Sequence, residues 1–295
     1  MAEFVISTCS TFDLTKEHAD SRDISVIYFH YSKDGERLDD DLFQSVTPAE
    51  FYGSMVAGAD MKTSQINTGE FLEYFGKFLK DGKDVIHFSL SSGISGVYSA
   101  AETAAKQLRT EFPDRKLYVI DSLAASGGLG LLVDQAADLR DEGKTIDEVR
   151  DWVEQNKLRL HHWFFSTDLT FYIKGGRVSK VSGAIGGMLG ICPLLNVSVD
   201  GKLVPRAKVR PKKKVIIEMV KRMEEHAENG YDYSGKVFMT QSECLPDAQA
   251  VADLITSKFP KMQGKVEITS IGAVIGSHTG PGTVALFFWG DPRVD

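Results

Sequence analysis

The side chains best suited to chemistry lie in four short polar segments, each bordered by glycine, proline or other polar residues. Their hydroxyl, guanidinium and imidazole groups are hydrogen-bond donors, and such groups either bind an anion such as a carboxylate or take part in nucleophilic catalysis. The candidates are Thr63, Ser64, Ser92, Ser95, Arg177 and His278.

The two central serines, Ser92 and Ser95, lie between a predicted strand and a predicted helix. Residues 85–90 form a short, mostly apolar run that predicts a buried strand, and residues 96–105 are rich in alanine and predict a helix. A turn between them points backbone N–H groups and the positive end of the helix dipole toward one spot, which suits an anion. The alternative is an ordinary helix with a serine N-cap.

Two mechanisms fit these residues, and the sequence leaves both open. In the first, Ser95 is a nucleophile, His278 its base and Asp121 the orienting acid, in the chain order of α/β hydrolases. No G-x-S-x-G motif surrounds Ser95, however. In the second, Thr63, Ser95 and His278 donate hydrogen bonds to a bound carboxylate and no bond is broken. Both Thr63, in residues 61–65, and His278, in the segment GSHTGPG, are predicted to lie in loops.

Composition narrows the class of protein. The chain has 295 residues and a formal net charge of −7, which argues against nucleic acid as a partner. Its cysteines, Cys9, Cys192 and Cys244, are far apart and predict free thiols in a reducing compartment, with no metal site. The longest apolar stretch, residues 184–199, is too short and too interrupted to span a membrane. We expect a cytoplasmic protein with at most transient contact with a membrane surface.

The order of the predicted elements indicates an α/β fold with two domains. Strands alternate with helices up to about residue 160, which predicts an N-terminal doubly wound, mostly parallel sheet over residues 1–162. Residues 25–31 are predicted as one of its strands. A hairpin followed by mixed helices and strands predicts an α+β domain over residues 163–295. Gly127, Gly128 and Gly130 lack the third glycine of a dinucleotide fingerprint, so we expect them to let a helix pack closely on the sheet.

Two further segments allow a structural and a functional interpretation. Residues 182–197 are small or apolar and almost uncharged, which is typical of a core segment or of the wall of a tunnel for an alkyl chain. Residues 206–214, RAKVRPKKK, form a basic cluster in an acidic protein. The cluster predicts either a solvated hairpin edge or a docking surface for an acidic partner, with Arg210 at its centre.

Six segments together resemble the DegV family of bacterial fatty-acid-binding proteins, in the order of that family and over nearly the whole chain. They are TSQ at Thr63, SSGISGVYSAA at Ser91, VIDS at Val119, KGGRV at Lys174, DGKLVPRAKVR at Asp200 and GSHTGPG at Gly276. One departure is Thr8-Cys9-Ser10, where family members usually have Thr-Asp-Ser.

The resemblance implies a lipid-binding protein without catalytic activity of its own and without a cofactor. A long-chain fatty acid would lie between the two domains, with its carboxylate bound by Thr63, Ser95, the Gly96 N–H and His278, and its acyl chain in the second domain. Ser64, Ser92 and Arg177 are secondary candidates for the same site. The partner implied is the catalytic subunit of a fatty acid kinase, which would make the acyl-phosphate and would dock near Arg210.

Overall fold

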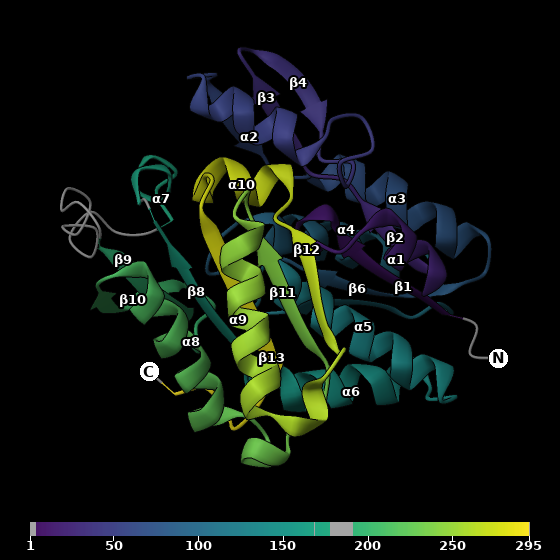
Figure 1. Cartoon of the computed structure of the whole chain (residues 1–295). Coiled ribbons are helices and arrows are strands. Elements are labelled where there is room, and N and C mark those ends of the chain that lie inside the picture. The colour runs from purple at the N-terminus through teal and green to yellow at the C-terminus, as the bar shows by residue number, and fades with distance from the viewer. Residues whose placement is uncertain (1–3, 168, 178–190, 295) are drawn as a thin grey trace.

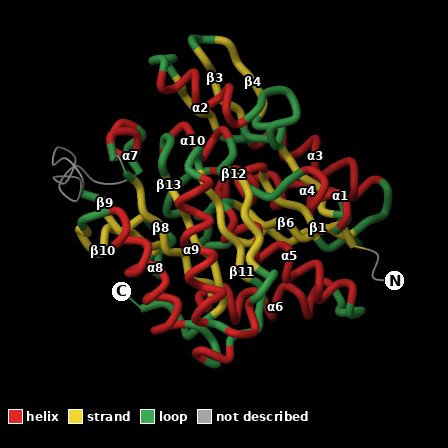
Figure 2. Tube along the Cα trace, viewed as in Figure 1, coloured by secondary structure: helices red, strands yellow, loops and turns green. Residues whose placement is uncertain are grey.

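The computed structural model describes residues 4–167, 169–177 and 191–294. Within these residues the strands form three sheets, and helices cover the faces of the two larger ones (Figure 1; Figure 2). The small third sheet lies at the top of Figure 1, next to α2 and α10. Short 3-10 turns occur at Ser10–Phe12, Lys157–Arg159, Gly230–Asp232 and Pro260–Met262.

The first sheet has four strands in the order β2–β1–β6–β7, and every pair is parallel. Helices connect the strands, as parallel pairing requires. The doubly wound parallel sheet predicted from the sequence is therefore confirmed. Its elements are β1 (Phe4–Cys9), α1 (Lys16–Ser21), β2 (Ile24–Ile27), α3 (Thr68–Lys80), β6 (Asp84–Ser89), α4 (Val97–Glu111), β7 (Leu117–Asp121), α5 (Gly127–Asp141) and α6 (Ile146–Asn156).

Successive side chains of each strand point to opposite faces of this sheet, and both faces are buried. Val85 and Val119 belong to the apolar cluster that includes α3 and α4, whereas Ile86 and Ile120 belong to the cluster that includes α5 and α6. This alternation follows from the two-residue repeat of a strand. It explains why residues 85–90 read as a continuous apolar run.

The second sheet has six strands in the order β10–β9–β8–β13–β11–β12, antiparallel except for the pair β11–β12. Helices α8 and α9 contact each other and cover one face of this sheet (Figure 1). The mixed architecture predicted for the second half is confirmed. The elements are β8 (Leu160–Ser166), α7 (Thr170–Lys174), β9 (Cys192–Val197), β10 (Leu203–Val209), α8 (Lys212–His226), β11 (Val237–Gln241), α9 (Leu245–Lys258), β12 (Val266–Ser270) and β13 (Thr283–Trp289).

The third sheet corrects two sequence-based predictions. Residues 25–31 do not form one strand, because the chain leaves the first sheet after Ile27 and enters the third sheet at His30. Residues 61–65 are not a loop, because residues 61–64 pair with β3. Both segments are short: β3 pairs with β4 directly after it and with β5, about 30 residues on, and only the second pairing lacks a local sequence signal. The elements here are β3 (His30–Lys33), β4 (Glu36–Asp39), α2 (Pro48–Val56), β5 (Met61–Ser64) and α10 (Ala273–Thr279).

Helix α5 is the layer between the two large sheets, since it contacts β1 and β6 of the first and β8, β11 and β13 of the second. Its glycines allow this approach. A Cβ atom on Gly128 would lie 2.1 Å from Nε2 of His162, and one on Gly130 would lie 2.6 Å from the backbone oxygen of Phe12. The close-packing role predicted for these glycines is confirmed.

The division into residues 1–162 and 163–295 stays a prediction, because β8 begins at Leu160 and α5 joins the cores of both halves. Of the predicted tunnel wall, residues 182–190 lie outside the described residues, Ile191 is partly buried, and residues 192–197 form the fully buried strand β9. Among the described residues, no helix is both long enough and apolar enough to cross a bilayer.

Replacing Gly128 by alanine should lower the free energy of unfolding by about 1–3 kcal/mol, because the added methyl group overlaps the buried His162 ring. Urea denaturation measures the change. The matched control is Gly53→Ala on α2, where a Cβ atom meets nothing within 4 Å and the higher helix propensity of alanine should leave stability unchanged or slightly raised. Equal effects of the two substitutions would contradict the packing argument.

Candidate ligand-binding site

Thr63 and His278, which are 215 residues apart in sequence, meet at the centre of the candidate site. Oγ1 of Thr63 lies 2.7 Å from Nε2 of His278. Thr63 comes from β5, and His278 comes from the last turn of α10. The prediction that His278 lies in a loop was wrong: it belongs to a helix of seven residues, and the loop begins only at Gly280.

Two buried aspartates from the N-terminal part of the chain cap the start of α10. Oδ1 of Asp13 accepts a hydrogen bond from the Gly272 N–H at 3.0 Å. The carboxylate of Asp40 accepts hydrogen bonds from the N–H groups of Ala273 and Val274, at 3.2 and 3.4 Å. Acceptors for these otherwise unpaired N–H groups stabilise a helix start. No local sequence signal marks this cap, because its acceptors lie more than 230 residues away.

Burial dominates the titration of both aspartates. It raises the pKa of Asp13 to about 7, against the opposing effect of hydrogen bonds from Ser126 and Gly272. Burial likewise raises the pKa of Asp40 to about 6, although backbone and Ser10 hydrogen bonds favour its charged form. Ionised carboxylates are therefore favoured at the helix only toward neutral pH.

His278 is neutral at physiological pH. Its partial burial, together with the positive charge of Arg177, lowers its pKa to about 4. Nη1 of Arg177 lies 3.5 Å from Nδ1 of His278, and a guanidinium can only donate, so Nδ1 is the accepting nitrogen. In the tautomer that this contact assigns, Nε2 carries the proton and donates a hydrogen bond to Oγ1 of Thr63. This arrangement leaves the Thr63 hydroxyl hydrogen available to a ligand.

A hydrogen bond to Gln65 connects Ser95 to the end of the strand that carries Thr63. Oγ of Ser95 donates to Oε1 of Gln65 at 3.3 Å and accepts a hydrogen bond from the Val97 N–H at 3.2 Å. The N-cap residue of α4 is Gly96 and it has no side-chain cap, so the serine N-cap that the sequence offered as the alternative interpretation is not formed. Gly96 is exposed, and a Cβ atom there would lie 3.0 Å from Oε1 of Gln65. Gln65, which links the two segments, was not among the predicted site residues, although it is part of the quoted TSQ motif.

Of the three secondary candidates, Arg177 contacts a residue of the site, whereas Ser64 and Ser92 do not. Arg177 contacts His278, as described. Ser64 is exposed, and its neighbour Thr63 points to the opposite face of β5. Ser92 is also exposed, and its backbone N–H donates to Oδ1 of Asp121.

The geometry of a serine hydrolase is not formed. Among the described residues, no hydrogen bond joins Ser95 to His278 or His278 to Asp121. The His278 nitrogens face Thr63 and Arg177 instead, and the Asp121 carboxylate accepts from the backbone N–H groups of Ser92 and Leu123.

An apolar cavity extends inward from His278 between the second sheet and the first part of the chain. Its volume is about 70 Å³, which is well below the usual range of ligand pockets. Its lining is mostly aliphatic and aromatic. The described residues that line it include Ile94, Ala125, Phe164, Val197, Ile275, His278 and Phe287.

A polar groove of about 400 Å³ lies on the other side of His278. His278 and Arg177 border both the cavity and the groove. The charged residues described along the groove are Lys62, Lys174 and Arg177 against one carboxylate, Asp60, so its potential favours an anion. The Thr63–His278 pair therefore lies where an apolar space meets a polar, cationic one.

Comparison with known proteins identifies the family. The model of the DegV family, described as uncharacterised proteins, matches residues 3–291. A DegV domain-containing protein of Clostridium perfringens is 36% identical over 293 residues, which cover 99% of each chain. This chain belongs to the DegV family.

Solved structures agree with this membership. One is a DegV family protein from Thermus thermophilus whose structure is described as showing fatty acid binding. It is 26% identical to this chain, with a TM-score of 0.85 over 98% of this chain and 99% of that one. The Streptococcus pneumoniae Fatty Acid Kinase B3 protein, loaded with linoleic acid, matches with a TM-score of 0.84 over 99% of this chain and 100% of that one. At 22% identity, the second likeness shows the fold alone.

In this DegV chain, Cys9 is a core residue. It is fully buried, its Sγ atom lies 3.6 Å from Nε2 of His87, and burial raises its pKa to about 12. Its neighbour Ser10 donates to Oδ2 of Asp40 and accepts from the Phe29 N–H. The first loop therefore supports the carboxylate that caps α10.

Replacing Asp13 by asparagine should flatten the dependence of stability on pH. A carboxyl group whose pKa is higher in the folded than in the unfolded state binds more protons when folded, so its contribution to stability falls as pH rises between the two values. For Asp13 this window runs from the ordinary 3.8 to about 7. Urea midpoints measured between about pH 5 and pH 7 should therefore fall more in the wild type than in the variant.

The Asp41→Asn variant is the control. Asp41 lies next to Asp40 in the sequence, but its described hydrogen bond is with the nearby Gln44 N–H and not with α10. It should keep the wild-type slope. A slope that is the same in all three proteins would show that Asp13 does not titrate in this range.

Proposed function

We propose that this protein binds a long-chain fatty acid, with the carboxylate at Thr63, Ser95, the Gly96 N–H and His278 and the acyl chain in the apolar cavity. One observation carries the proposal: a pair of neutral hydrogen-bonding groups stands at the junction of an apolar cavity and a cationic groove. An amphiphile with a carboxylate at one end matches both spaces. A fully polar ligand would leave the cavity unfilled.

The tail supplies most of the binding free energy in this arrangement. Each methylene group moved from water into the cavity contributes about 0.8 kcal/mol. The carboxylate loses hydration when it binds, and charge-assisted hydrogen bonds from the protein offset that cost. The Thr63 hydroxyl is free to donate when it accepts from His278, and the nearby Arg177 guanidinium adds positive charge.

The family supports this assignment. The Thermus thermophilus relative is described as a fatty-acid-binding protein, and it shares the fold over nearly the whole chain. Ser95 and Gly96 enter the proposal through the matching SSGISG segment, and Ser95 lies one hydrogen bond from Gln65 beside Thr63. Ser64 and Ser92, which are exposed and turned elsewhere, are not assigned to the carboxylate.

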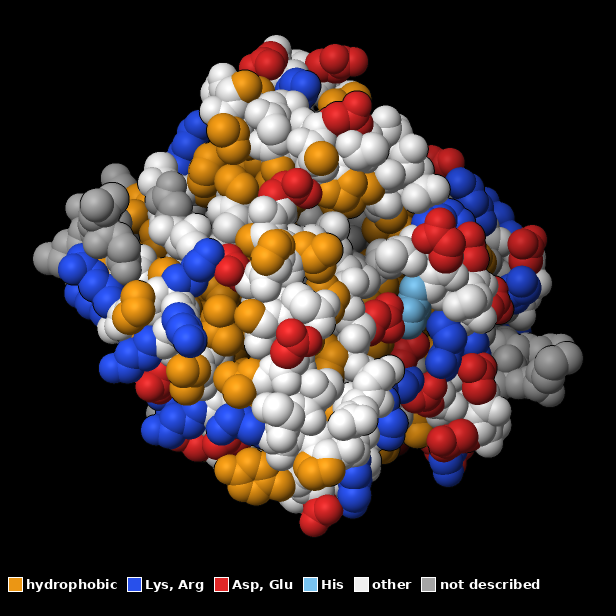
Figure 3. Space-filling view, in the orientation of Figure 1, with side chains coloured by type: hydrophobic (Ala, Val, Ile, Leu, Met, Phe, Trp, Pro, Cys, Tyr) orange, Lys and Arg blue, Asp and Glu red, His pale blue; other side chains and the backbone are white. Residues whose placement is uncertain are grey.

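We further propose that the protein presents the fatty acid to a kinase subunit and does not itself catalyse acyl-phosphate formation. The groove beside the proposed carboxylate site is open to solvent, which supports access by a partner. Arg210 is exposed at the end of β10, and Lys and Arg side chains gather over β10 and α8 in Figure 3. Such a surface suits an acidic face of a partner.

Substituting Thr63 by valine should weaken fatty acid binding by about tenfold to hundredfold, because one donor to a charged group is lost at nearly constant shape. Ser64→Val is the matched control on the same strand, and it should bind like the wild type. Titration with a fluorescent fatty acid measures both. Equal weakening in the two variants would remove Thr63 from the carboxylate site.

The ligand class has its own test, which does not depend on any variant. Solvent extraction of the purified wild-type protein, followed by mass spectrometry, should release a fatty acid. Repeated preparations that release none, and that do not take up added fatty acid, would overturn the proposal.

Charge reversal at Arg210 tests the docking surface. Arg210→Glu should lower the rate of acyl-phosphate formation by a fatty acid kinase catalytic subunit while fatty acid binding stays unchanged. The control, Lys83→Glu, reverses an exposed charge before β6 and should change neither quantity. If Arg210→Glu lowers binding and the kinase reaction together, Arg210 is structural and the docking proposal fails.

A further inference from the structure

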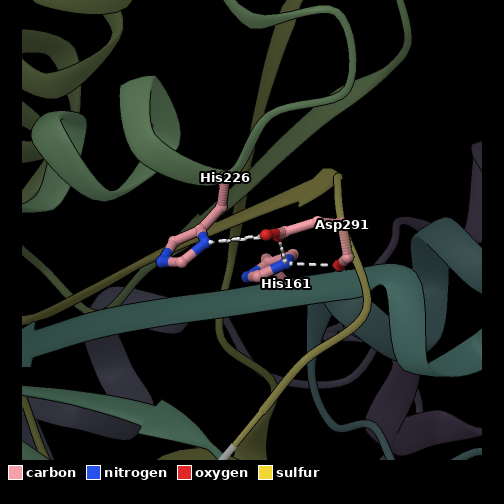
Figure 4. Close-up of side chains that lie close together, drawn as sticks. All are labelled: His161, His226 and Asp291. Atoms are coloured by element: carbon pink, nitrogen blue, oxygen red, sulfur yellow. Dashed lines mark hydrogen bonds and ion pairs between the residues drawn. The ribbon is translucent and has the colours of Figure 1, made fainter.

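A second group of polar side chains lies away from the proposed fatty acid site. His161 is on β8, His226 is the last residue of α8, and Asp291 follows the end of β13 by two residues (Figure 4). One ligand atom from each lies within 4.8 Å of the other two. Oδ1 of Asp291 is 3.1 Å from Nε2 of His161 and 3.2 Å from Nδ1 of His226.

These separations are close to those between ligands of a bound metal ion. With bonds of 2.0–2.1 Å, two ligands of a tetrahedral zinc ion are about 3.3 Å apart. The two nitrogen–oxygen distances already meet this value, whereas the His161 and His226 rings are stacked and must rotate for both nitrogens to point to one ion. Two histidines and one carboxylate are ligands for divalent ions of intermediate softness, and they leave a coordination position open.

Neighbouring groups hold the donors in place. The His161 ring is stacked between Phe288, at 5.2 Å, and His226, at 4.8 Å between ring centroids. The Asp291 N–H donates to the backbone oxygen of His226 at 3.0 Å. His161 is 4% exposed, and its Nε2 atom also lies 2.9 Å from the backbone oxygen of Asp291.

We propose that His161, His226 and Asp291 form a binding site for a divalent transition-metal ion such as Zn²⁺. The ion would join three chain segments that are distant in sequence: β8, the end of α8 and the segment after β13. Adjacent residues of a strand point to opposite faces, so His162 borders the apolar cavity while His161 faces the metal site behind it. The proposal is independent of the fatty acid.

Calorimetric titration of the metal-free, full-length protein with ZnCl₂ at pH 7, in a buffer that does not bind metals, tests the site. We expect one equivalent bound by the wild type and at least a tenfold loss of affinity in His226→Ala and Asp291→Asn. Asparagine still accepts hydrogen bonds from the imidazoles, so Asp291→Asn distinguishes metal coordination from a hydrogen-bonded cluster. Zn²⁺ should also raise the melting temperature of the wild type but not of the variants.

His30→Gln is the control variant. In the wild type, one ring nitrogen of His30 faces Asp39 and the other faces Glu70. The histidine and both carboxylates therefore cannot bind the same ion. The variant should therefore bind Zn²⁺ like the wild type. The proposal is overturned if the wild type binds no Zn²⁺, or if His226→Ala and Asp291→Asn bind it unchanged. Fatty acid uptake measured on the same samples keeps this outcome separate from the proposed function.

Discussion

The candidate site depends on how the start of α10 is held. A helix of seven residues is too short to be stable by itself, so its position must come from tertiary contacts. Asp13 and Asp40 supply them at its first N–H groups, and the Tyr52 hydroxyl donates to the Ile271 carbonyl just before it. These contacts join the N-terminal part of the chain to the segment that carries His278. The geometry of His278 is therefore determined at the opposite end of its own helix.

Burial controls the charge at both ends of this helix, with a different consequence at each. At the start, it raises the pKa values of two carboxyl groups, which weakens the negative charge that a bound carboxylate would otherwise feel. At the end, it keeps His278 uncharged, so the ring fixes the direction of the Thr63 hydroxyl rather than forming an ion pair. The positive charge of the site then comes from Arg177 and the groove lysines, which lie nearer solvent, where desolvation costs less.

The sequence predicted the parts of the fold that depend on local patterns. The parallel sheet, the hairpin and the packing role of Gly127, Gly128 and Gly130 follow from periodicity and residue size. The sequence failed where a short element is held by distant partners, as in the strand at Thr63 and the helix at His278, and where one apolar run divides between two sheets, as in residues 25–31. The Asp13 and Asp40 cap was missed for the same reason. The chemistry of their side chains already suggested that Thr63 and His278 share one site, and the family resemblance then supplied the ligand.

The apolar cavity follows from how the layers of the fold meet. Helix α5 approaches the second sheet closely because glycines face Phe287 and His162, and immediately before it the small residues Ala125 and Ser126 border the open space. Protein interiors are otherwise packed to the density of organic crystals, and an empty apolar space forfeits the contacts of every residue around it. In the proposed complex the alkyl chain would lie in this space, and the polar junction at Thr63 and His278 would keep the carboxylate toward the groove.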